Sequence, residues 1–257
     1  MPLSHATVIT LLRSAGCVFA EDEAELLFAA ARTPDDLTAM VERRTAGLPL
    51  ELVVGWAEFY GLRIAVEPGV FVPRRRTEFL VEQALALAPD ARVVVDLCCG
   101  SGAVGVALAS ALGGAELHAA DIEPAAVRCA RRNVTPLGGQ VHEGDLFTAL
   151  PPELRGRVDL LAANAPYVPT GQVALLPSEA RDHEPLVALD GGADGLDILR
   201  RVAAEAPDWL APGGLLLVET SERQAPVAAK VFADSGLIPK GAVSEELHAT
   251  VVIGERP

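Results

Sequence analysis

Three aspartates follow short apolar segments, and their spacing places them at one edge of a predicted sheet. Asp96 lies near the end of VVVDL, Asp121 ends AELHAAD, and Asp145 follows the segment VHEG. The carboxyl ends of parallel strands meet at one edge of an open α/β sheet, and such folds bind ligands there. We therefore expect the three carboxylates to line one crevice, where they accept hydrogen bonds from hydroxyl, amino or ammonium groups.

A glycine-rich turn follows the first of these aspartates. Gly100 and Gly102 open the pattern Gly-x-Gly-x-x-Gly between an apolar strand and a helical stretch at 104–112. Glycine permits a tight turn and a close approach of a ligand to the backbone, and a helix N-terminus favours electron-rich groups. We expect both glycines to contact a nucleoside cofactor. The spacing alone is shared by nicotinamide and flavin enzymes.

Asp96 distinguishes between these cofactors. Four positions before Gly100, its carboxylate would meet a cationic amino-acid group, whereas beside a pyrophosphate it would cost free energy through like-charge repulsion. The pattern therefore favours S-adenosyl-L-methionine as the cofactor, with S-adenosyl-L-homocysteine as its product. Asp121 then suits the ribose hydroxyls and Asp145 the adenine amino group, while Phe147 would support the adenine ring. The alternatives are a turn or helix cap for Asp145 and plain core for Phe147.

The loop after the fourth apolar segment suits a planar nitrogen as methyl acceptor. Asn164, Ala165, Pro166 and Tyr167 follow RVDLLAA. The lone pair of an amide or aromatic amine is delocalised, so such a nitrogen attacks poorly unless its N–H groups are held in place. The side-chain oxygen of Asn164 and the carbonyl of Ala165 can accept those hydrogen bonds. Pro166 would fix the turn, and Tyr167 would give the acceptor an aromatic wall. The alternative is an ordinary Asn-x-Pro turn.

Alternating helical and apolar stretches from Thr77 onward predict the elements that position these residues. Short apolar runs occupy 93–97, 115–121, 158–164 and 213–220, with helical periodicity between them. This alternation predicts an α/β domain over 77–257, with a parallel sheet and crossover helices on both faces.

The segment before this domain has a different pattern. Apolar positions recur at helical spacing over 4–47, with a break at Pro34, and we assign residues 1–61 to a small helical N-terminal domain. Alternation at 62–66, a turn at Pro68-Gly69 and the apolar residues 70–72 predict a β-hairpin linker over 62–76.

Charge and composition exclude several classes of protein. The net charge is −14, with 35 acidic and 21 basic residues, which disfavours nucleic acid as a partner. No uncharged apolar run approaches the ~18–20 residues of a membrane helix, and the N-terminus lacks the features of an export signal. We therefore expect a cytoplasmic protein without a membrane partner. The four cysteines and five histidines show no metal-ligand spacing, so no metal site is predicted.

Taken together, these motifs resemble those of the PrmC/HemK-type protein-(glutamine-N5) methyltransferases, which methylate the glutamine of the Gly-Gly-Gln loop in peptide chain release factors. The resemblance covers 43–82, the glycine loop, GDLF at 144–147, the loop at 164–167 and EPLVALDGGADGL at 184–196. It implies a seven-stranded class I (Rossmann-like) methyltransferase domain behind a helical N-terminal domain that recognises a protein substrate. The further cofactor contacts expected from it are Phe71, Pro73, Arg74, Thr77, Ile122, Leu146 and Asn164, with Glu78 in the same segment.

The chain departs from the family's usual motifs at four places. The usual N-P-P-Y is NAPY at 164–167, G-T-G-S-G is CCGSG at 98–102, P-R-P-E-T-E is PRRRTE at 73–78, and E-I-G is ETS at 219–221. The proposed chemistry survives these changes, because the Ala165 carbonyl still points where that of the replaced proline would. They indicate a diverged relative, so a release factor is a narrower expectation than a glutamine acceptor.

Three alternatives remain at this stage. An Asn-x-Pro-Tyr loop also orients an exocyclic amine, as in N6-adenine methyltransferases acting on a flipped base, although the net acidity weighs against nucleic acid. A small-molecule amide is another possible acceptor. The departures from the family motifs also leave open a protein that binds the cofactor without turnover.

Overall fold

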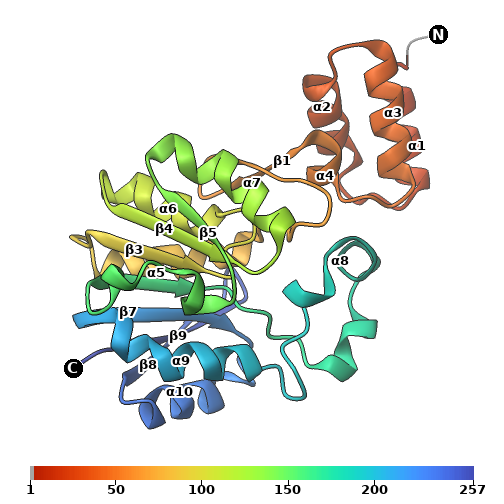
Figure 1. The fold of residues 1–257 in the computed structure, drawn as a ribbon. Helices are drawn as coiled ribbons and strands as arrows, with labels where there is room; N and C mark the ends of the chain where they lie inside the picture. Colours follow the sequence, from red (N-terminus) through yellow and green to blue (C-terminus); the bar gives the residue numbers. More distant parts are fainter. Residues whose placement is uncertain (1–2) are drawn as a thin grey trace.

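A seven-stranded sheet forms the centre of the larger part of the molecule (Figure 1). The computed structural model describes residues 3–257, so residues 1–2, with which the predicted N-terminal domain begins, lie outside the described part. The strand order is β5-β4-β3-β6-β7-β9-β8, and among these strands β9 alone runs in the opposite direction to the others. The strands are β3 (Val93–Leu97), β4 (Glu116–Asp121), β5 (Gln140–Glu143), β6 (Val158–Ala163), β7 (Leu210–Thr220), β8 (Ile238–Ser244) and β9 (Ala249–Glu255).

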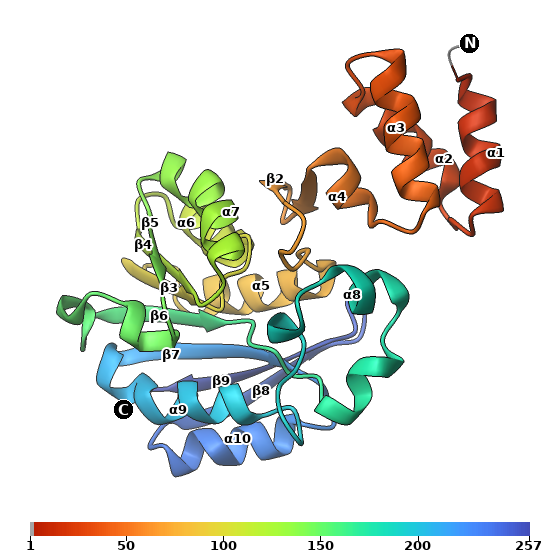
Figure 2. The same cartoon turned by 45° about the vertical axis from the view of Figure 1, so that its right-hand side comes forward.

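Helices cover both faces of this sheet (Figures 1 and 2). One face carries α5 (Glu78–Leu87), α6 (Ala103–Leu112) and α7 (Pro124–Val134), and the other carries α9 (Asp197–Trp209) and α10 (Ala225–Asp234). The alternation of side chains along β3 explains the two layers, because Val94 packs in the first cluster and Val95 in the second. The predicted parallel sheet with crossover helices on both faces is confirmed.

Four short helices before the sheet have a hydrophobic cluster of their own. They are α1 (His5–Ser14), α2 (Ala20–Ala30), α3 (Pro34–Thr45) and α4 (Leu50–Val54). Val8, Leu12 and Leu27 are fully buried between them. Pro34 begins α3 because the first helical turn needs no N–H there, and the Thr33 hydroxyl caps the helix by accepting the Asp36 N–H at 3.1 Å. The predicted helices before the sheet are therefore present, while the division of the chain into three domains stays a prediction.

The predicted hairpin is wrong in its second strand. β2 (Leu62–Ala65) pairs with β1 (Trp56–Phe59), not with residues 70–72. The reason is the two-residue turn Tyr60-Gly61, whose positive φ angles of 51° and 71° match the turn that joins tightly twisted strands. Val72 instead donates its N–H to the carboxylate of Glu184 at 3.1 Å.

A long excursion between β6 and α9 lies beside the carboxyl edge of the sheet (Figure 2). It contains the 3-10 helices η5 (Thr170–Leu175) and η6 (Leu186–Ala188) around α8 (Ser178–His183). The other 3-10 helices are η1 (Arg75–Thr77), η2 (Thr135–Leu137), η3 (Leu146–Ala149) and η4 (Pro152–Leu154). Within residues 3–257, the structure contains no helix with the length and apolarity that crossing a membrane requires.

Candidate active site

A cavity of about 550 Å³ opens at the carboxyl edge of the sheet, within the size range of small-molecule sites. Its lining comes from the strand ends, the segment before α5 and the excursion after β6. The predicted site residues that line it are Phe71, Pro73, Arg74, Thr77, Asp96, Gly100, Asp121, Ile122, Asp145, Leu146, Asn164, Ala165, Pro166 and Tyr167. Segments far apart in the sequence thus meet at one site.

The glycine turn and Asp121 are held together by backbone hydrogen bonds. The Gly100 N–H donates to Asp121 Oδ2 at 2.8 Å, and the Glu123 N–H donates to Oδ1 at 2.9 Å. Gly100 has a φ of +55°, a conformation that glycine adopts without strain. Burial raises the pKa of the Asp121 carboxyl above its usual value. The carboxylate keeps free lone pairs for a hydroxyl-bearing ligand.

Asp96 is enclosed at the inner end of the cavity. Its residue is 1% exposed, and Oδ2 accepts the Gly105 N–H at 2.8 Å. A Cβ on Gly105 would lie 3.1 Å from the Asp96 side chain, so this glycine lets the start of α6 approach the carboxylate. Burial raises the pKa of Asp96 to about 8. A cationic ligand group would stabilise its charged form.

Charge pairing around the cavity favours such a cation. The lining arginines are each paired with a carboxylate: Arg74 with Glu184, Arg76 with Glu219 and Arg201 with Asp145. Among residues 3–257, no basic side chain forms an ion pair with Asp96 or Asp121. The two carboxylates without a counter-ion fit a ligand that carries ammonium and sulfonium charges and ribose hydroxyls, as S-adenosylmethionine does. A pyrophosphate would find no free cation there.

Two predicted cofactor residues, Gly102 and Phe147, do not line the cavity, and their contacts with a cofactor stay predictions. Gly102 caps α6 with a φ of +78°, and a Cβ there would come within 2.8 Å of Val134 on α7. Phe147 is 1% exposed and stacks on Trp209, with ring centroids 5.4 Å apart. The chain turns at Leu146, whose φ is +48°, so Leu146 lines the cavity and the next side chain enters the core. Asp145 lines the cavity but also accepts a bond from Arg201.

Asn164 stands directly after β6 and is oriented by a second side chain. Its Nδ2 donates to the Thr77 hydroxyl at 3.4 Å, and Thr77 is 2% exposed. This contact turns the Asn164 side-chain oxygen away from Thr77 and leaves it available as an acceptor. Ala165, which follows, is 3% exposed and also lines the cavity. The structure therefore brings together the two acceptor groups that the sequence predicts.

Tyr167 is anchored by its hydroxyl. Arg76 Nη2 donates to the Tyr167 oxygen at 2.7 Å, and that hydroxyl donates to Glu219 Oε1 at 3.0 Å. Burial, followed by the charge of Glu219, raises the pKa of the Tyr167 phenol above its usual value. The phenol therefore stays neutral at physiological pH.

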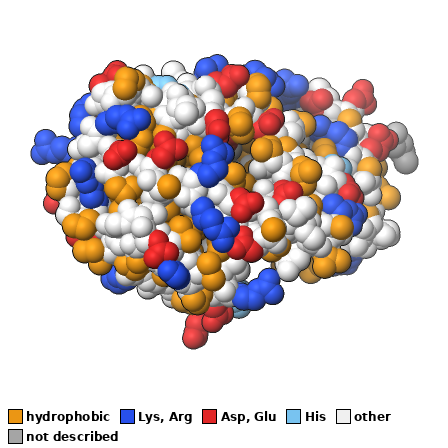
Figure 3. Space-filling model, turned by 60° about the horizontal axis from the view of Figure 1, so that its bottom comes forward, with side chains coloured by type: hydrophobic (Ala, Val, Ile, Leu, Met, Phe, Trp, Pro, Cys, Tyr) orange, Lys and Arg blue, Asp and Glu red, His pale blue; other side chains and the backbone are white. Residues whose placement is uncertain are grey.

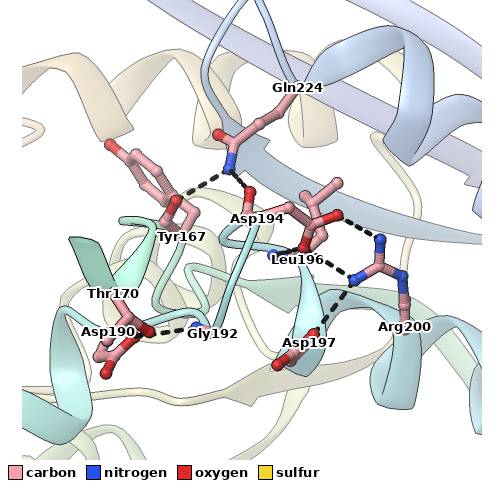
Figure 4. Close-up of polar contacts among 9 residues, drawn as sticks. All are labelled: Tyr167, Thr170, Asp190, Gly192, Asp194, Leu196, Asp197, Arg200 and Gln224. Carbon is pink, nitrogen blue, oxygen red and sulfur yellow. Dashed lines mark hydrogen bonds and ion pairs between the residues drawn. The ribbon is translucent and has the colours of Figure 1, made fainter. Parts of the chain in front are cut away.

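The loop at 164–167, which we call the acceptor loop, has its backbone held by Gln224 and by the chain around 190–197 (Figure 4). Gln224 Nε2 donates to the carbonyl oxygens of Tyr167 and Asp194, each at 2.9 Å. A Cβ on Gly195 would overlap the Tyr167 carbonyl, so glycine is required for this close approach. Arg200 closes the loop by pairing with Asp194 and Asp197. Gln224 and Gly195 were not predicted as site residues, although the glycines of DGGADG mark the loop.

Metal ligands are not gathered at this site. Among residues 3–257, no three His, Cys, Asp or Glu side chains group as metal ligands would. The cysteines of the glycine turn, Cys98 and Cys99, are free thiols whose pKa burial raises. Cys98 has a φ of +53° at the place where the family's usual pattern has glycine. Strained backbone of this kind is concentrated at ligand sites.

Comparison with known proteins gives consistent results. Residues 61–176 match the family described as methyltransferase small domain. The release factor glutamine methyltransferase of Geobacter sulfurreducens is 41% identical over 208 residues, which are 79% of this chain and 72% of that protein. The 4-amino-L-phenylalanine/4-methylamino-L-phenylalanine methyltransferase of Streptomyces pristinaespiralis is 38% identical over 203 residues, covering 76% of this chain and 69% of that one.

A solved structure shares the fold. The 16S rRNA N2 G1207 methyltransferase of T. Thermophilus, in complex with AdoMet and guanosine, superposes with a TM-score of 0.57 and 22% identity, over 79% of this chain and 50% of that one. The seven-stranded class I methyltransferase fold is thereby confirmed. The 41% sequence identity to the Geobacter sulfurreducens protein extends over most of both chains, so it shows a common family and not only a common fold. The chain belongs to the release factor glutamine methyltransferase family of S-adenosylmethionine-dependent enzymes.

Proposed function

We propose that the protein transfers a methyl group from S-adenosylmethionine to the side-chain amide nitrogen of a glutamine in the Gly-Gly-Gln loop of a peptide chain release factor. One observation carries this proposal. The same cavity is lined by Asp96 and Asp121, which have no ion-pair partner among residues 3–257, and by Asn164, whose side-chain amide is oriented by Thr77. When bound, the cofactor supplies an electrophilic methyl group on a sulfonium that is already a good leaving group.

Orientation is the main contribution of the protein to this reaction. An amide nitrogen attacks only when its lone pair faces the methyl group, so its N–H groups must be held. The side-chain oxygen of Asn164 and the carbonyl of Ala165 accept hydrogen bonds from those N–H groups. The contact with Thr77 fixes the orientation of the Asn164 side chain. Such positioning can supply several kcal/mol and up to ~7–11 kcal/mol in favourable cases. The acceptor nitrogen gives up one N–H proton to solvent as it gains the methyl group, and no strong base is required to remove that proton beforehand.

The helical N-terminal part supports recognition of a protein substrate. Arg44 of α3 pairs with Glu23 of α2 at 2.6 Å and with Glu179 of α8 at 2.8 Å. This contact joins the helices to the excursion that lines the cavity. Val18 and Phe19, between α1 and α2, are 83% and 68% exposed and offer apolar surface to a protein. An acceptor of this kind would place the enzyme in the cytoplasm, where translation occurs.

A small aromatic amine is the second candidate acceptor. The relative from Streptomyces pristinaespiralis is named for 4-amino-L-phenylalanine, whose nitrogen is also conjugated to a π-system. Adenine in nucleic acid is less well supported. The face in Figure 3 intersperses basic with acidic side chains, and the arginines of the cavity are paired with carboxylates.

Thermal unfolding tests the cofactor, and labelled methyl transfer tests the acceptor. S-adenosylhomocysteine should raise the unfolding temperature and NADH should not, because only a ligand that binds the folded state stabilises it. Label from S-adenosylmethionine should appear in a purified release factor and be absent when its Gly-Gly-Gln glutamine is replaced by glutamate. Transfer to free 4-aminophenylalanine, without transfer to release factor, would instead support the second candidate.

A further inference from the structure

Arg76 and Tyr167 form a shared wall between the active-site cavity and a second cavity. The second cavity, of about 580 Å³, lies where β7 ends and β8 turns into β9. Both residues line both cavities, and Glu219 lines the second. The proposed function uses only the ring of Tyr167, so the hydroxyl and its two partners require an explanation of their own.

Three side-chain groups meet at the Tyr167 hydroxyl. Arg76 Nη2 donates to the phenol oxygen at 2.7 Å, and the phenol donates to Glu219 Oε1 at 3.0 Å. Arg76 Nε also donates to Glu219 Oε1, at 3.0 Å. The planar guanidinium is suited to this contact, because it presents two donors in fixed directions. One arginine thus holds a phenol and a carboxylate together.

Glu219 connects this cluster to the rigid part of the fold. It belongs to β7, where it pairs with Val251 of β9, and its side chain is 2% exposed. Its second oxygen is buried without a hydrogen-bond partner. Among residues 3–257, Arg76 is the only cation that forms an ion pair with Glu219. Arg76 is therefore the ion-pair partner that the buried carboxylate has in the described chain, and the two side chains fix each other.

We propose that Arg76 and Glu219 are positioning residues that hold the Tyr167 ring as the acceptor wall. Glu219 belongs to β7 of the central sheet and binds Arg76. Both side chains bind the phenol oxygen of Tyr167. Arg76 stands where the family's usual P-R-P-E-T-E pattern has glutamate, whereas Tyr167 and Glu219 match the usual N-P-P-Y and E-I-G patterns, so only the arginine of this anchor departs from them. The consequence for catalysis rests on the proposed function, but the anchoring of the ring does not.

Fluorine NMR tests the anchoring without turnover. The chain has two tyrosines, so Tyr60→Phe leaves Tyr167 as the only site for 3-fluorotyrosine. In this background, Arg76→Gln and Glu219→Gln should each shift and broaden the single resonance. Arg75→Gln is the matched control, because Arg75 is an exposed neighbour without an ion pair in the described chain. An unchanged resonance in Arg76→Gln would overturn the proposal.

A double-mutant cycle then tests the effect on the reaction. Tyr167→Phe removes the hydroxyl and Arg76→Gln removes its arginine partner, so both variants lose the contact between Arg76 and Tyr167. Each should lower kcat by about tenfold, and the double variant should lose about tenfold rather than about a hundredfold. S-adenosylhomocysteine should stabilise all three equally. Independent, multiplying losses would contradict the proposal. If wild type methylates no acceptor, the proposed function fails, and the NMR experiment still decides the anchoring.

Discussion

The side-chain amide of Asn164 lies 3.4 Å from the hydroxyl of Thr77, and this contact joins the end of β6 to the turn before α5. The two residues are 87 positions apart in the sequence. The hydroxyl accepts from Nδ2, so the amide oxygen is the atom left for the methyl acceptor. In the proposed function, the orientation of the acceptor therefore depends on Thr77, a residue that acts on the acceptor only through Asn164.

Thr77→Val should lower kcat. Valine has nearly the same shape but no hydroxyl, so it removes only the contact that orients Asn164. Loss of one hydrogen bond of about 1 kcal/mol corresponds to roughly a fivefold decrease in rate. Steady-state kinetics measures this, with Thr38→Val on α3 as the control, because the Thr38 hydroxyl bonds only within its own helix. Equal kcat in both variants would show that Thr77 does not orient Asn164.

Asp96→Asn should change how stability depends on pH in the protein without cofactor. The folded chain keeps the Asp96 proton up to about pH 8, whereas a free aspartate loses it near pH 3.8. Between these values the folded state binds more protons than the unfolded state, so wild-type stability decreases as pH rises. Asparagine cannot ionise, which removes this contribution.

Urea unfolding at pH 5 and pH 8 measures the effect of Asp96. The stability of Asp96→Asn relative to wild type should increase by several kcal/mol between the two pH values. The same variant should bind S-adenosylhomocysteine more weakly, because the ammonium group loses its carboxylate. Parallel stability curves for the two proteins would mean that Asp96 is not buried as a neutral acid.

Gly195→Ala should displace the acceptor loop and abolish methyl transfer. A methyl group at this position would overlap the Tyr167 carbonyl and the Gln224 amide, which together hold the loop. Gly236→Ala is a matched control. Gly236 also has a positive φ, +86°, but open space around its Cβ position, so it should cost only about 1–2 kcal/mol of backbone strain. Urea unfolding and transfer assays separate the two effects. Equal activity in both variants would show that Gly195 does not hold the loop.

The sequence predicts the sheet and the strand ends because these depend on local patterns. VVVDL at 93–97 matches β3 residue for residue, and Asn164 follows β6 as expected. The alternation of apolar and polar residues does not show which segment pairs with β2, because a candidate strand lies on each side of it in the sequence. Val70 and Val72 are apolar and buried, but the left-handed turn at Tyr60-Gly61 decides the pairing in favour of Trp56–Phe59.

The groups that orient the site residues were not predictable in the same way. Arg76 and Glu219 are 143 positions apart, and no periodicity connects them. The sequence shows Arg76 only as a departure from the family's usual P-R-P-E-T-E pattern. The burial of Phe147 has a related origin, because a single left-handed residue, Leu146, decides which of two neighbouring side chains meets the cavity.

Mapping of the transferred methyl group by tandem mass spectrometry tests the central claim most directly. Purified release factor is incubated with isotopically labelled S-adenosylmethionine and either wild type or Asn164→Ala. The proposed function predicts one labelled methyl group on the side-chain nitrogen of the Gly-Gly-Gln glutamine with wild type. It predicts none with Asn164→Ala, although S-adenosylhomocysteine still stabilises that variant. Label on another residue or on nucleic acid, or equal labelling by the two proteins, would contradict it.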